Sequence, residues 1–121
     1  MTTVSGHTTA IRAKTVLGTS VYNRTGKKIG TVEDVILDKT SNNIMFAVLG
    51  FGGLLHMGEH FYPVPWSKLE YDEQLKGYTV DIDEPQLQTA PHDSIDSLTR
   101  GDGKAYRDQA FKFYETRPYW M

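Results

Sequence analysis

The sequence contains no cysteine in its 121 residues. Disulfide bonds, thiolate nucleophiles and cysteine-ligated metal sites are therefore excluded, and a reducing compartment is expected. Long hydrophobic segments are also missing. The longest apolar run, residues 44–55, is interrupted by three glycines and is too short to span a bilayer. The first residues contain no apolar stretch of signal-peptide length, so we expect no transmembrane segment and a cytoplasmic location.

An excess of charge of one sign is lacking as well. Thirteen Lys and Arg residues are balanced by fifteen Asp and Glu residues. A nucleic-acid partner is not expected, because binding to a phosphate backbone usually requires a basic face. The length is that of one domain with short extensions.

Composition divides the chain into three parts. Residues 1–14 are rich in Thr and Ser and have no apolar period, which predicts a flexible leader. In residues 15–91, short runs rich in Val, Ile, Tyr and Phe alternate with turn residues, the pattern of a small barrel or sandwich. Residues 92–121 are expected to form a helical extension with an aromatic tail. The predicted fold class is therefore all-β with a short C-terminal α-helix.

Five extended segments are predicted within the β-rich part. The segment 60–66 contains two prolines, each of which removes a backbone donor, so this segment must lie at a sheet edge or corner. The apolar residues of the segment 28–38 fall on both parities, so a β-bulge or strong coiling within residues 30–34 is needed to direct them to one core. The predicted segments are 20–22, 28–38, 44–49, 60–66 and 77–83.

The segment 44–49 is apolar at every position. A strand of this kind is covered on both faces, one by the core of the domain and the other by a further element. The cover could be the C-terminal helix or a second subunit. This two-sided strand is the first indication of a partner.

The C-terminal part predicts short helical turns at residues 84–90 and 94–98, followed by a longer helix. Asp102 is the expected N-cap of this helix, which should extend to about Glu115. Its aromatic residues recur at helical spacing, and an isolated helix of this length is marginal in water, so it must dock through that stripe. The stripe consists of Tyr106, Ala110, Phe113 and Tyr114.

A series of short motifs runs in order from Gly18 to Pro91. The motifs are Val21-Tyr22-Asn23 with Gly26, Ile29-Gly30, Val32-Glu33-Asp34-Val35, Asp38, Ala47-Val48-Leu49, Gly52-Gly53, Val64-Pro65-Trp66 with Leu69, Gly77-Tyr78, and Gln86-Leu87 with Ala90-Pro91. Together they resemble the PRC-barrel family, which is named after the cytoplasmic domain of the photosynthetic reaction centre H subunit. No single motif is specific; the resemblance lies in their order and spacing.

This resemblance implies a small, strongly bent, six-stranded β-barrel that acts as an adaptor rather than a catalyst. The chain is most similar to stand-alone bacterial members of the family. One alternative is a component like the H subunit, which would associate with a photosynthetic protein complex at the membrane surface. The chain lacks the N-terminal transmembrane helix of that subunit.

Chemistry-bearing residues are few. His56 and His60 could ligate zinc or nickel in a metal-dependent enzyme, but no third ligand can be placed. Glu33, Asp34 and Asp38 are interpreted as solvated carboxylates, with Asp38 capping a turn. No catalytic residue, cofactor or metal is therefore predicted.

The predicted function is a non-catalytic scaffold that forms a homodimer with two-fold symmetry. Large apolar residues gathered near one another usually mark such an association surface. The expected interface residues are Met45, Ala47, Leu49, Phe51, Leu54, Leu55, Phe113, Tyr114, Tyr119 and Trp120. The residues expected to shape the fold are Gly26, Gly30, Gly52, Gly53, Pro65 and Trp66.

Overall fold

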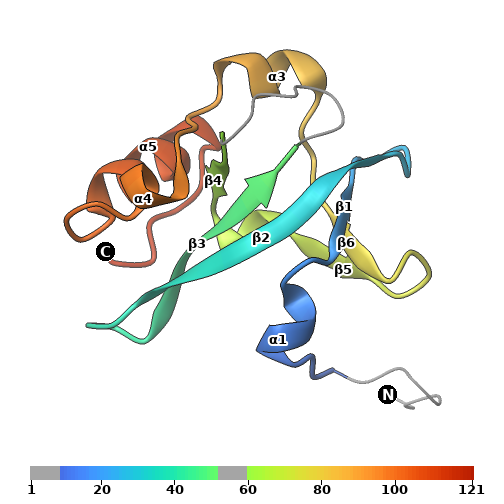
Figure 1. Cartoon of the computed structure of the whole chain (residues 1–121), viewed down its shortest axis with the longest axis horizontal. Helices are drawn as coiled ribbons and strands as arrows, with labels where there is room; N and C mark the ends of the chain where they lie inside the picture. The colour runs from blue at the N-terminus through green and yellow to red at the C-terminus, as the bar shows by residue number, and fades with distance from the viewer. Residues whose placement is uncertain (1–8, 52–59) are drawn as a thin grey trace.

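The computed structural model of the chain describes residues 9–51 and 60–121. Its strands form one six-stranded sheet in the order β4-β3-β2-β1-β6-β5 (Figure 1). The strands are β1 (Ser20–Tyr22), β2 (Lys28–Asp38), β3 (Asn43–Gly50), β4 (Tyr62–Val64), β5 (Glu70–Asp72) and β6 (Gly77–Thr79). The predicted small six-stranded β fold is confirmed.

The sheet is antiparallel except where β1 runs parallel to β6, with Val21 opposite Tyr78. Strands β4 and β5 form its two edges and are connected through the short 3-10 helix η1 (Trp66–Lys68). The hydrogen-bonded sheet is thus open between these edges rather than closed into a barrel. Proline at position 63, opposite Val48, fits the edge position predicted for this segment, since it has no N–H to donate.

Strand β2 is long and irregular. The predicted bulge is present as a register shift between Val32 and Asp34, and a second shift follows between Ile36 and Leu37. The second shift was not predicted. Each bulge changes the face to which the following side chains point. The second shift leaves Met45 of β3 as the extra residue, so that Ile44 lies opposite Leu37. Ile36 packs toward the C-terminal helices, and Leu37, the next residue, borders the opposite side of the hairpin, as alternation along a strand requires.

The helices are α1 (Ala13–Val16), α3 (Glu84–Thr89), α4 (Ile95–Leu98) and α5 (Lys104–Phe113). Helix α3 lies within the predicted turn at residues 84–90 and ends before Pro91. It begins with a capping box between Asp83 and Gln86, which was not predicted. Helix α1 begins inside the segment expected to be a leader, and its Val16 is part of the main core. The structure thus adds a short helix that the sequence did not predict.

Helix α5 is not capped by Asp102 as expected, and it ends at Phe113. The N-cap is Gly103, which has a left-handed φ of 74°. A Cβ at this position would lie 2.9 Å from Sδ of Met45, so glycine alone fits without a shift. The Asp102 carboxylate instead accepts a hydrogen bond from the Lys104 N–H at 3.1 Å, one residue outside the cap.

The chain itself covers both faces of β3. On one face, Phe46 and Val48 are fully buried with Leu98 of α4. On the other face, Ala47 belongs to the main core, which also contains Val21 of β1 and Val32 of β2. Helices α4 and α5 lie on one side of the β2–β3 hairpin and α1 on the other (Figure 1). Of the two covers considered for this strand, the structure contains the C-terminal helical extension.

Candidate interaction surface

The residues predicted to form an interface occupy different environments. Met45, Ala47, Leu49, Phe51 and Tyr114 are buried within the chain. Their role in an interface remains a prediction. Met45 would become accessible only if the helical extension left the sheet, and Ala47, Leu49 and Phe51 only if the main core opened. Phe113, Tyr119 and Trp120 are half-buried. Leu54 and Leu55 lie outside the described residues.

The aromatic tail folds back onto α5. The guanidinium carbon of the buried Arg107 lies 3.6 Å from the centroid of the Trp120 ring and 5.9 Å from that of Tyr119. The Phe111 ring makes an edge contact with Trp120, with centroids 4.9 Å apart. Asp108 binds the guanidinium at 3.0 Å. The tail is therefore held by a cation–π contact and ring packing within the same chain.

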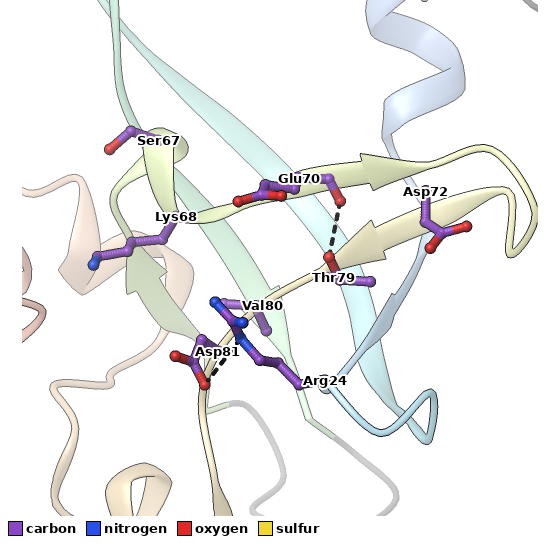
Figure 2. A pocket seen from close by; sticks show the side chains of 8 residues that line it. All are labelled: Arg24, Ser67, Lys68, Glu70, Asp72, Thr79, Val80 and Asp81. Carbon is purple, nitrogen blue, oxygen red and sulfur yellow. Dashed lines mark hydrogen bonds and ion pairs between the residues drawn. The ribbon is translucent and has the colours of Figure 1, made fainter.

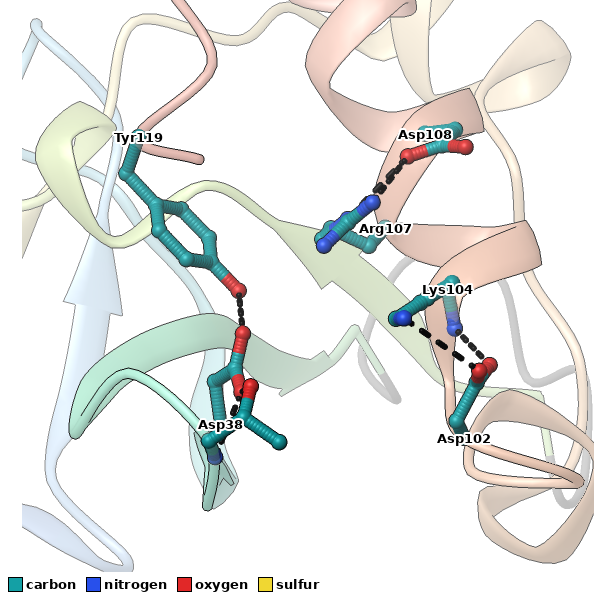
Figure 3. A network of polar contacts seen from close by, with 7 residues as sticks. Asp38, Asp102, Lys104, Arg107, Asp108 and Tyr119 are labelled. Carbon is teal, nitrogen blue, oxygen red and sulfur yellow. Dashed lines mark hydrogen bonds and ion pairs between the residues drawn. The ribbon is translucent and has the colours of Figure 1, made fainter. Parts of the chain in front are cut away.

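Asp38 connects this tail to the β2–β3 hairpin. The Tyr119 hydroxyl donates a hydrogen bond of 2.7 Å to one carboxylate oxygen (Figure 3). The N–H and hydroxyl of Thr40 donate to the other oxygen, which confirms the predicted turn cap. These bonds from Thr40 and Tyr119 lower the pKa of Asp38 well below its ordinary value. The expectation that Asp38 is solvated is wrong, because the tail covers it and leaves it buried.

An apolar groove lies on the opposite side of the hairpin, between α1 and β2. Its volume is about 400 Å³. We call it the α1–β2 groove; it is lined by Ile11, Ala13, Lys14, Val16, Leu17, Asp34, Val35, Leu37, Ile44 and Trp66. Leu37 is 65% exposed at this groove, and Ile11 and Leu17 are also exposed. Three large exposed apolar side chains thus gather at one site.

The exposure of Leu37 follows from the local fold. Alternation along β2 places Leu37 on the same side of the hairpin as Val35 and α1, and the second bulge brings its partner Ile44 to that side. Helix α1 has only four residues, and it buries Val16 alone. The far end of the hairpin is therefore left without a cover by the described residues. The sequence pattern predicts a strand at Leu37 but does not predict the groove. The apolar residues Ile11, Val16 and Leu17 before the first strand were the available signal.

A second, polar depression of about 500 Å³ lies beside β5 and β6 (Figure 2). Arg24 and Asp81 form an ion pair of 3.4 Å there, with both side chains largely exposed. Lys68, Glu70 and Asp72 also line the depression. Positive and negative side chains alternate in this open site, so it has no concentrated charge of one sign with which to select a ligand. Exposed ion pairs of this kind contribute little free energy.

The predicted metal candidate is only partly described. His60 is exposed, and its ring centroid lies 4.9 Å from that of His92. His56 lies outside the described residues. Within residues 9–51 and 60–121, no group of three or more His, Asp or Glu side chains is placed to hold a metal ion.

Four of the six residues predicted to shape the fold lie in the described part of the chain. Gly26 has a φ of 87° in the turn after β1. A Cβ on Gly30 would lie 2.1 Å from the carbonyl oxygen of Gly50, so only glycine allows this close approach between neighbouring strands. Pro65 is fully buried, and Trp66 packs on Tyr78 with ring centroids 5.4 Å apart. Gly52 and Gly53 lie outside the described residues.

No helix in the described part of the chain is long and apolar enough to cross a membrane. No curated protein matches the sequence. A family model described as the PRC-barrel domain matches residues 8–87. This match contains all six strands of the sheet and covers well over half of the chain. The chain therefore belongs to the PRC-barrel domain family, a family of protein-interaction domains.

Proposed function

We propose that this chain is a non-catalytic protein-interaction module that forms a homodimer through the α1–β2 groove. The observation that carries the proposal is the 65% exposure of Leu37 beside an apolar groove of about 400 Å³. Exposed apolar residues clustered in this way usually mark an association surface. Burying a leucine side chain fully is worth roughly 1.5–3 kcal/mol, so a few such residues can supply the core of an interface.

The non-catalytic role is supported by two aspartates whose carboxylates accept hydrogen bonds that hold the fold together. Asp38 binds Thr40 and Tyr119, and its pKa is lowered by those bonds. Asp93 accepts a hydrogen bond from Tyr106, which lowers the pKa of its carboxyl group. Both carboxylates thus serve as acceptors for structural hydrogen bonds, and the lowered pKa values move them further from the neutral range in which a general acid or base works best.

The homodimer is tested by light scattering coupled to size-exclusion chromatography, over protein concentrations from low to high micromolar. We expect the wild-type chain to be a dimer. Leu37→Asp should weaken the dimer at least about 100-fold, since it removes an apolar contact and introduces a charge that must be desolvated.

The matched control is Met121→Asp, which makes the same chemical change at a residue that is 92% exposed and does not line the groove. This variant should remain a dimer. A wild-type chain that is monomeric at every concentration would contradict the proposal, as would a Leu37→Asp variant that stays dimeric. A monomer that co-purifies with a photosynthetic membrane complex would favour the H-subunit-like alternative instead.

A further inference from the structure

The α1–β2 groove combines a projecting side chain and a recess on the same surface. In a dimer with two-fold symmetry every contact occurs twice: if residue i of one copy contacts residue j of the other, residue j of the first also contacts residue i of the second. A surface can therefore pair with itself only if it supplies both halves of each contact. Leu37 supplies the projection and the groove between α1 and Ile44 supplies the recess. The surface has the shape features that self-association requires.

The charges of the groove have the same property. Lys14 and Asp34 are the cationic and anionic residues that line it. Neither forms an ion pair within the described chain. Oδ1 of Asp34 accepts a hydrogen bond from the N–H of Val35 at 2.8 Å, which leaves its other oxygen for a further donor. Because each copy carries one charge of each sign in this groove, two copies related by a two-fold axis can form two identical ion pairs, each between Lys14 of one copy and Asp34 of the other.

The chain's own N-terminal residues are a poorer match for the groove. Residues 1–8 contain only two large apolar side chains, Met1 and Val4, and no charged side chain to pair with Lys14 or Asp34. A second copy of the groove offers several apolar residues and both charges. The occupant that complements the groove in both respects is therefore a second copy of this chain.

We infer that two copies pair through this groove with Leu37 inserted into the partner's recess and Lys14 of each copy bound to Asp34 of the other. This inference rests on the proposed function and specifies its geometry. It also predicts that reversing the charge at either position places two like charges opposite each other, twice in each dimer. Such an arrangement opposes self-association.

The test uses two singly reversed variants, Lys14→Glu and Asp34→Lys, with different affinity tags. Each variant alone should self-associate at least tenfold more weakly than the wild type. Mixed in equal amounts, they should form a heterodimer, because each then supplies the charge that the other lacks. Urea unfolding of each variant checks that the fold is kept. Glu33→Lys provides a matched reversal at an exposed β2 position that does not line the groove, and this variant should dimerise like the wild type.

Cysteine cross-linking gives a second readout should Asp34→Lys fail to fold. The chain has no cysteine, so only introduced thiols can react. Lys14→Cys mixed with Asp34→Cys should give a disulfide-linked heterodimer on mild oxidation, whereas Lys14→Cys mixed with Met121→Cys should not. If Leu37→Asp dissociates the dimer but neither charge exchange nor cross-linking follows the predicted pairing, the inference is overturned and the proposed function stands. If Leu37→Asp has no effect, both are overturned.

Discussion

The hydroxyl group of Tyr114 is buried without a hydrogen-bond partner in the described part of the chain. Burial also raises the pKa of this hydroxyl above its ordinary value. An unsatisfied buried donor costs roughly 1–3 kcal/mol. We therefore expect Tyr114→Phe to increase the free energy of unfolding by about 1 kcal/mol, measured by urea denaturation at neutral pH.

Tyr106→Phe is the matched control for this change. The Tyr106 hydroxyl donates a hydrogen bond to Asp93, so its removal should lower the free energy of unfolding. Loss of a bond to a charged acceptor costs roughly 1.5–3 kcal/mol. A Tyr114→Phe variant that is as destabilised as Tyr106→Phe would indicate that the hydroxyl of Tyr114 is satisfied after all.

The fold should lose stability at low pH because Asp38 becomes protonated. Its carboxylate is ionised in the folded state with a pKa below that of an unfolded aspartate, which is about 3.9. The stability from this ionised form is present above pH 4 or so and is lost as the pH falls through and below that value. As the pH is lowered from 7 to 2, the thermal unfolding temperature of the wild type should therefore fall more steeply than that of Asp38→Asn.

Asp81→Asn separates this effect from a general loss of negative charge. The Asp81 side chain is largely exposed in its ion pair with Arg24, so its contribution is screened by solvent. We expect its acid dependence to follow the wild type. A parallel acid dependence for Asp38→Asn and the wild type would contradict the role assigned to the bonds from Thr40 and Tyr119.

At the scale of elements, the tail and α5 are joined by the contact between Arg107 and Trp120. A desolvated cation–π contact is worth about 2 kcal/mol, and ring packing adds to it. Trp120→Ala should therefore lower the free energy of unfolding by about 2 kcal/mol in urea denaturation. Met121→Ala, at the exposed end of the same tail, should change it by less than about 0.5 kcal/mol. Equal effects of the two substitutions would mean that the tail is not held by this contact.

The elements with a strong local pattern could be predicted from the sequence. The two-sided strand β3, the proline-containing edge strand β4 and the helical turn before Pro91 each follow from residues close together in the chain. The start of α5 was not predicted, because Asp102 is the better N-cap by residue type, whereas the structure uses Gly103 in a left-handed conformation that packs against Met45, far away in the sequence. Helix α1 was missed because four residues give too little periodicity to recognise.

At the scale of the molecule, the sequence indicated that β3 needed a second cover but did not distinguish the helical extension from a partner. Cover by the helical extension and cover by a partner bury the same apolar residues, so both give the same hydrophobic pattern in the sequence. The groove was missed for a related reason. Leu37 points to the same side of β2 as Val35, which packs against the main core, and it is exposed because no described element covers that end of the hairpin. Exposure at this position is a property of the assembled sheet.

The parallel pairing of β1 with β6 has a consequence for synthesis of the chain. Val21 lies opposite Tyr78, and almost half of the chain separates them. Pairings between such distant segments form slowly, because a long loop must close first. During translation, β1 can pair with β2 early, but its other edge stays open until Gly77–Thr79 has left the ribosome. Until then that edge can pair with a neighbouring nascent chain, so the aggregation risk continues until β6 has emerged and joined the sheet.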